Sequence, residues 1–229
     1  MLSFKTFSLV ALLSLIFSTA QSQETKTVSV KRKNDYFTIS EKYAALKTDP
    51  NIKHGPYSAS ISSYSEKGQF EHGIKTGVWE AYDGGKLVQK YDFQTHIFLQ
   101  DDVHKMISSV QLLDETGQTV ADLNGVGVYL GGDAKIISVL VRSVRYPADA
   151  QQNNVQGWVV IEAKIDKQGK LSDEKAISTN GYGLEEEGLR VFKMLPPDWL
   201  PVFVEGKPAD VRVQFKIAFR LSNLPPLKN

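Results

Sequence analysis

Apolar and polar residues alternate in the last long segment of the chain, from Val211 to Leu221. A period of two, kept over this length, predicts a β-strand with one buried face. The opposite face carries Arg212, Gln214 and Lys216, followed by Ala218. Because these polar side chains point away from the predicted core, we expect them to be available to a partner.

Upstream of this strand, from residue 129, some segments have apolar residues at helical spacing, and others have apolar and polar residues in strict alternation. Tyr146-Pro147 and Pro196-Pro197 mark helix ends, because proline disfavours helix at the residue before it. The expected elements are helix 133–144, a short helix to about residue 153, strand 157–166, strand 171–178, helix 184–195 and the last strand. Residues 129–222 are therefore predicted to form an α+β domain, in which two helices pack on a small antiparallel sheet.

The first half of the chain shows a different, repeated pattern. Gly55-Pro56-Tyr57 recurs as Gly77-Val78-Trp79, and glycine turns separate short segments that each carry an aromatic residue. Such a pattern predicts β-hairpins stacked side by side over residues 36–97. The segment 75–82 resembles a MORN-type repeat. Since two clear units fall short of the three or so that usually bury a continuous core, we expect this segment to pack on a neighbouring one.

Residues 98–128 lie between these two patterns and are assigned as a connector. Val103 to Leu113 has nearly helical spacing. Turn signals at 114–117 and 122–125 are equally consistent with short strands. The sequence leaves both alternatives open.

The C-terminal pattern, taken as a whole, resembles the C-terminal domain of TonB, a periplasmic module that grips outer-membrane transporters. The resemblance covers about 90 residues and depends on the order and spacing of several short motifs. These motifs are Gly131-Gly132; Tyr146, Pro147 and Ala150; Gly157; Gly169; Arg190, Lys193, Met194, Pro196 and Trp199; Gly206-Lys207-Pro208; and Phe219-Arg220-Leu221. Ala218 stands where the family commonly has proline, and Gly188 where its helix usually has alanine. The resemblance implies a module that binds a protein or peptide and performs no chemistry.

The N-terminal 22 residues have the pattern of a secretory signal peptide. Lys5 precedes an apolar run from Phe7 to Phe17, and Ser18-Thr19-Ala20 offers small residues for cleavage. The run is shorter than the roughly 20 residues that span a bilayer. We expect a periplasmic or secreted protein; the alternative is an inner-membrane anchor formed by the uncleaved segment. Residues 23–35 are expected to be a polar tether, and residues 223–229 a tail.

Composition argues against several classes of function. The net charge of +1 favours neither nucleic acid nor an anionic membrane surface. There is no cysteine, and the four histidines lack the spacing of a zinc-binding helix. The chain also has no Gly-x-Ser-x-Gly nucleophile motif. We therefore expect no enzyme, no catalytic residue, no metal and no small-molecule cofactor.

These observations together favour a non-enzymatic peptide- or protein-binding module of the periplasm or envelope. The resemblance to the TonB C-terminal domain implies a link to TonB-dependent transport across the outer membrane. The partner of the module would be a protein or an extended peptide, such as a segment of an outer-membrane transporter, paired along a sheet edge. The candidate partner-binding residues are Arg212, Gln214 and Lys216. One alternative is a structural envelope scaffold without a transport role, and a homodimer is an alternative partner arrangement.

Overall fold

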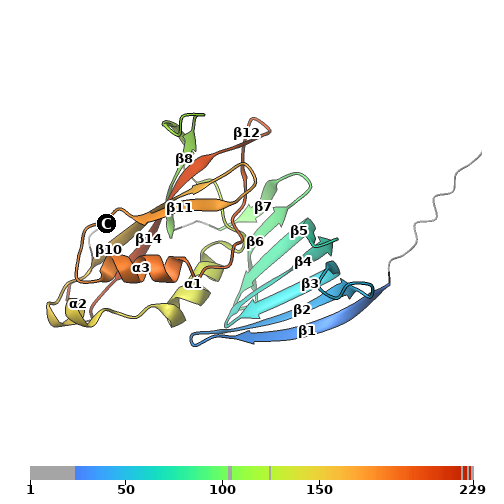
Figure 1. Cartoon of the computed structure of the whole chain (residues 1–229), viewed down its shortest axis with the longest axis horizontal. Helices are drawn as coiled ribbons and strands as arrows, with labels where there is room; N and C mark the ends of the chain where they lie inside the picture. The colour runs from blue at the N-terminus through green and yellow to red at the C-terminus, as the bar shows by residue number, and fades with distance from the viewer. Residues whose placement is uncertain (1–23, 103–104, 124, 223, 226, 228–229) are drawn as a thin grey trace, which may run out of the picture.

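The computed structural model describes residues 24–102, 105–123, 125–222, 224–225 and 227. The predicted signal peptide lies outside the described residues. The fold is α+β, as the sequence predicts, with a β-rich N-terminal half and a C-terminal sheet that packs against helices (Figure 1). Three helices, α1 (Gly132–Ser143), α2 (Ala148–Gln152) and α3 (Leu184–Phe192), all belong to the C-terminal half of the described chain.

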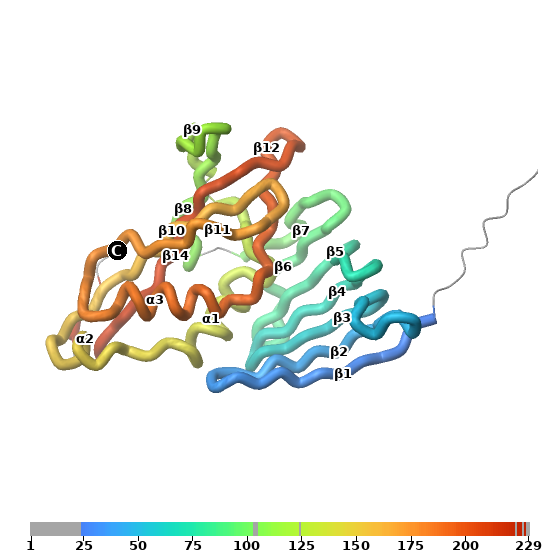
Figure 2. Tube along the Cα trace, in the orientation of Figure 1, coloured from blue at the N-terminus to red at the C-terminus, as the bar shows by residue number. Residues whose placement is uncertain are grey.

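The N-terminal half is one seven-stranded antiparallel sheet, in which each strand pairs with the next one along the chain (Figure 2). Its strands are β1 (Thr25–Lys33), β2 (Thr38–Leu46), β3 (Lys53–Ile61), β4 (Tyr64–Glu71), β5 (Ile74–Asp83), β6 (Lys86–Asp92) and β7 (Ile97–Asp101). Hairpins of this kind are what the glycine turns predict, while the likeness to MORN repeats stays a prediction. The predicted polar tether is wrong in one respect: most of it forms β1, because it pairs with β2 over its whole length.

Aromatic side chains fill the inner face of this sheet. Tyr57, Trp79 and Tyr91 are buried, and the rings of Tyr57 and Trp79 lie 5.2 Å apart. Gly68 lies beneath the indole of Trp79, where a Cβ atom would come within 2.3 Å of the ring. The indole of Trp79 in β5 thus packs over a glycine of β4, the strand before it in the chain.

The C-terminal half contains a five-stranded antiparallel sheet with the order β11-β10-β14-β8-β9. Its strands are β8 (Ile107–Leu113), β9 (Thr119–Asp122), β10 (Gly157–Ile165), β11 (Leu171–Ala176) and β14 (Val211–Phe219); β12 (Val202–Val204) and β13 (Lys207–Ala209) form a separate small hairpin. Of the two alternatives for the predicted connector, its described residues form strands and no helix. The predicted domain limits stay predictions, but a fragment that begins near residue 128 would lack β8.

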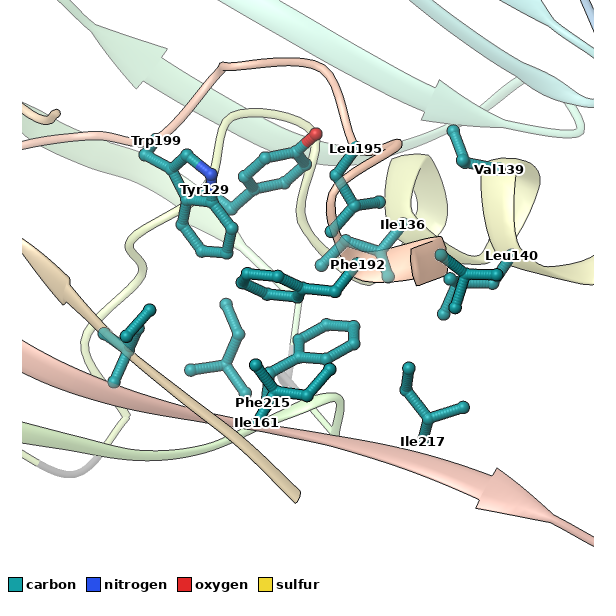
Figure 3. Packing of buried hydrophobic residues seen from close by; sticks show 14 of the residues in the cluster. Tyr129, Ile136, Val139, Leu140, Ile161, Phe192, Leu195, Trp199, Phe215 and Ile217 are labelled. Carbon is teal, nitrogen blue, oxygen red and sulfur yellow. The ribbon is translucent and has the colours of Figure 1, made fainter. Parts of the chain in front are cut away.

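Helices α1 and α3 cover one face of this sheet and enclose an apolar core (Figure 3). The ring of Phe192 lies 5.3 Å from that of Phe215 and 5.6 Å from that of Trp199. Gly188 of α3 lies against Val159 of β10, and a Cβ atom there would approach Val159 to 2.5 Å. This close approach accounts for glycine at a helical position where the resembling family usually has alanine.

The two sheets meet at the start of α1. The side chain of Gln89 in β6 donates to the carbonyl of Tyr129 at 3.2 Å and accepts from the N–H of Gly131 at 2.6 Å. Further along the helix, Arg142 donates to the hydroxyl of Ser62 at 3.0 Å. The inner face of the N-terminal sheet therefore packs against the neighbouring half of the chain, as the small number of repeats predicts.

Candidate functional site

The three predicted partner-binding residues lie on β14, on the face opposite the core. Lys216 is exposed, whereas Arg212 and Gln214 are half-buried. The buried positions alternate with them, and Phe215 is 1% exposed. The two faces of the strand are thus separated as the alternation predicts, and the binding role of the polar face stays a prediction.

Two of the three side chains are engaged within the protein. Arg212 donates to the carbonyl of Gly117 at 3.1 Å and to the hydroxyl of Thr119 at 3.0 Å, and so holds the loop between β8 and β9. Gln214 donates to Glu162 at 3.4 Å. Among the described residues, the ammonium group of Lys216 has no such partner.

The backbone of β14 is not a free edge over its first half, contrary to the expectation of a partner that pairs at Gln214. β10 pairs with β14 along its whole length, and β8 pairs with the other side from Val211 to Phe215. Gln214 is flanked by Glu162 on one side and Ser109 on the other. The sequence did not predict a strand beside β14 on this side. β8 lies about 100 residues earlier in the chain and meets β14 only in the folded structure.

The second half of β14 is different. The N–H of Lys216 donates to the carbonyl of Met106 at 2.7 Å, and this is the last bond between β14 and the β8 segment in the described chain. Because N–H groups alternate in direction along a strand, the N–H of Ala218 points to the same side as that of Lys216. Ala218 is exposed. Among the described residues, no strand pairs with residues 217–219 on this side, so they form a short open edge in line with β8.

A second feature of interest, a cluster of buried charges, lies between the two sheets. Lys135 of α1 is 3% exposed, and its ammonium group lies 2.8 Å from Glu66 of β4 and 2.6 Å from Asp198 in the loop after α3. Lys75 of β5 also pairs with Asp198. Sequence reasoning missed this cluster. No local signal marks it, because each of its ion pairs joins residues more than 60 positions apart, which meet only in the folded chain.

The electrostatics of this cluster keep Asp198 and Lys135 ionised. Burial alone would raise the pKa of Asp198, but the ammonium groups of Lys135 and Lys75 outweigh it and hold that pKa well below its usual range. Likewise, burial would lower the pKa of Lys135, but Glu66 and Asp198 raise it. Each buried charge therefore has an opposite charge in contact, which is what a low-dielectric environment requires.

A cleft of about 460 Å³ opens beside this cluster. Its lining residues include Glu41, Lys53, Lys135 and Asp198. The charged side chains that line the cleft already form ion pairs with one another. They therefore form a structural network in which each charge has a partner. In the described parts of the chain, no three histidine, aspartate or glutamate side chains gather so that they could hold a metal ion.

The comparisons with known proteins agree with the C-terminal geometry. Residues 142–221 match the family model described as the Gram-negative bacterial TonB protein C-terminal. Searches of curated proteins and of solved structures gave no significant match. The matched residues run from the end of α1 to just past β14 and include neither β8 nor the seven-stranded sheet.

The match indicates no enzyme family; TonB C-terminal domains are non-enzymatic and interact with outer-membrane transporters. None of the helices within the described residues is both long and apolar enough to span a bilayer. The C-terminal part of this chain is thus similar to the TonB C-terminal domain, a likeness that suggests a TonB-like envelope protein linked to the energy transduction of transport.

Proposed function

We propose that the chain is a non-enzymatic binding module of the cell envelope, which pairs an extended segment of a protein partner with the edge of its C-terminal sheet. The observation that carries this proposal is the state of β14. It already pairs with one extended segment, β8, and no described strand pairs with residues 217–219 in line with that segment. Backbone hydrogen bonds to such an edge would give affinity, and neighbouring side chains would give selectivity.

Lys216 is the candidate selectivity residue. It is exposed and lies at the junction between the occupied and the open parts of β14. An acidic or polar side chain of the partner would therefore find an ammonium group beside the pairing edge. Arg212 and Gln214 would act indirectly, because their side chains hold the β8–β9 loop and Glu162.

The alternative is a structural envelope scaffold. It is favoured by the same strand, since β8 covers the first half of β14 and leaves only a short edge. In a scaffold, the open residues would have no specific partner. The two functions therefore differ in whether the N–H of Ala218 contributes to binding.

The test is a comparison of Ala218→Pro with Ala218→Ser. Proline removes the N–H that faces the open edge and leaves the bonds to β10 intact, whereas serine keeps the N–H. Labelled peptides from periplasm-facing segments of outer-membrane transporters serve as probes. We expect the proline variant to bind about fivefold or more weakly than the serine variant, since one hydrogen bond is lost and the ring obstructs close pairing. Circular dichroism checks that both variants fold.

Two results would contradict the proposal. If none of the peptides binds the unmodified protein, the scaffold is favoured. Equal binding by the folded proline and serine variants would show that a partner does not pair at this edge. Should the proline variant not fold, Lys216→Glu provides the second measurement, because it leaves the backbone unchanged and should weaken the binding of an acidic peptide.

The predicted cleavage of the leader is part of this proposal. A protein that acts in the periplasm after cleavage would begin near residue 21 or 23. N-terminal sequencing of protein recovered from its host checks this expectation. An intact Met1 on membrane-bound protein would instead favour the anchored alternative.

A further inference from the structure

The edge of the seven-stranded sheet at β1 differs from the other sheet edges of the described chain. β1 is nine residues long and pairs with β2 in unbroken register from Thr25 to Lys33. The other edges of the two large sheets, β7, β9 and β11, are four to six residues long, and the pairing of each has a register shift. Bulges and short strands are the usual means of protecting an edge from another chain. β1 has neither of them, and it contains no proline.

The backbone of β1 presents a regular row of donors to its open side. At the two ends of the hairpin, Lys47 donates to the carbonyl of Glu24 and Asn34 donates to that of Phe37. In an antiparallel pair, these bonds fix the alternation, so the even-numbered residues of β1 bond to β2. The N–H groups of the odd-numbered residues, including Ser29 at the centre, therefore point away from the sheet. No other described strand pairs with that side.

The charged side chains of this edge are all positive. β1 contains Lys26, Lys31, Arg32 and Lys33, all exposed, and no acidic residue. Arg32 reaches the buried Glu41 of β2. Within the described chain, the other three side chains form no ion pair. Three of the four cations lie at the C-terminal end of the strand. The positive charge is therefore unevenly distributed along the edge, and the charges of a partner would have to match this distribution.

We propose that β1 is a docking edge for an acidic extended segment of another protein, which adds to the seven-stranded sheet as an eighth, antiparallel strand. The segment would carry carboxylates opposite residues 31–33 and again opposite Lys26, with small or β-branched residues between them. Backbone bonds would supply affinity, and the opposite charges would set the register and direction.

A second copy of the chain fits this edge less well. Antiparallel pairing of two β1 strands about Ser29 would place Lys26 opposite Arg32 and Thr27 opposite Lys31. Like charges directly opposite each other destabilise a strand pair. The lysines that discourage apolar strands and self-pairing would favour an acidic segment, so the same residues would exclude some partners and select another.

The first test uses a designed probe and the full chain. The probe is a labelled, end-blocked peptide, Glu-Glu-Glu-Val-Thr-Val-Thr-Glu-Thr, whose carboxylates fall opposite the cations in the antiparallel register. Its control has lysine in place of every glutamate. We expect fluorescence anisotropy to show binding of the acidic peptide only, and binding that weakens as the salt concentration rises.

Variants then separate pairing from charge. Ser29→Pro removes one outward N–H and leaves the bonds to β2, and Ser29→Ala is its matched control. We expect the proline variant to bind the acidic peptide about fivefold more weakly than the alanine variant. If Ser29→Pro does not fold, the double variant Lys31→Glu, Lys33→Glu keeps the backbone and should lose the acidic peptide and gain the basic one.

Several results would overturn this inference. Absence of binding by the acidic peptide would leave the lysines as a guard against aggregation and nothing more. Equal binding by folded Ser29→Pro and Ser29→Ala would show that the peptide does not add as a strand. A dimer in sedimentation experiments that dissociates in Ser29→Pro would assign the edge to a second copy. Ala218→Pro should leave this binding unchanged, so the outcome is independent of the proposed function at β14.

Discussion

The seven-stranded sheet pairs each strand with its neighbour in the chain, whereas the central strand of the C-terminal sheet pairs with strands from residues 107–113 and 157–165. The two halves also bury different groups. The C-terminal half buries mainly apolar side chains, and its buried polar side chains in the described chain are Lys135, Ser138 and Ser143 of α1. The inner face of the N-terminal sheet buries Glu41, Glu66 and Gln89 among its aromatic rings.

This difference has an energetic consequence. A buried polar group is stable only when it has a partner. Glu66 and Gln89 each have one partner within the sheet, Tyr64 and Asp101 respectively. Their remaining partners come from the other half: Glu66 pairs with Lys135 of α1, and Gln89 bonds to the backbone just before α1. In contrast, the buried side chains of the C-terminal half pack mainly against other side chains of the same half. We infer that the N-terminal sheet depends on the C-terminal half more than the reverse.

The largest test of this dependence is Lys135→Met. Methionine fills a similar volume but leaves Glu66 without its cation and Asp198 with Lys75 alone, so the free energy of unfolding should fall by about 3–5 kcal/mol. Chemical denaturation measures the loss, and Lys42→Met on the outer face of the sheet is the control. An unchanged denaturation midpoint would mean that the cluster does not join the two halves.

Phe215→Ala should also lower the free energy of unfolding by about 3–5 kcal/mol, because it leaves a cavity in the apolar core rather than an unpaired charge. Phe215 is 1% exposed and packs against Phe192 of α3. We expect its loss to be independent of pH, unlike that of Lys135→Met. Denaturation at neutral and at acidic pH distinguishes the two variants, and an equal response to pH would contradict the contrast between the halves.

Acid should weaken the contact between the halves through Asp198. The pKa of Asp198 is lower in the folded than in the unfolded chain, so its contribution to stability is present above the unfolded pKa of about 3.9 and is lost as the pH falls below it. Asp198→Asn should therefore be less stable at neutral pH and lose less stability between pH 5 and 3. Parallel titration curves for the variant and the unmodified protein would refute this assignment.

The smallest effect is expected on the polar face of β14. Lys216 is exposed and has no ion-pair partner within the described residues, so Lys216→Ala should change the free energy of unfolding by about 0.5 kcal/mol or less. Thermal denaturation checks this value. A larger loss would indicate that Lys216 has a structural role, and would weaken its assignment as a binding residue.

The sequence by itself determined the elements whose signals are local. The alternation of Val211–Leu221 gave the burial of β14, and the recurrence of glycine and aromatic residues gave the hairpins of residues 36–97. Proline at 147 and at 196 marked helix ends close to those observed. In each of these cases, residues a few positions apart in the chain are also neighbours in the structure.

Only the tertiary structure decided which edges are open. Residues 107–113 have a spacing between helix and strand, and their pairing with β14 settles the matter because the bonds come from a segment about 100 residues away. In the sequence, Lys135 has the pattern of a solvent-exposed helix residue. Only the folded structure shows that Glu66 and Asp198 pair with it. The cost of a buried charge or an unpaired strand depends on groups brought together by folding, and no short stretch of sequence contains them.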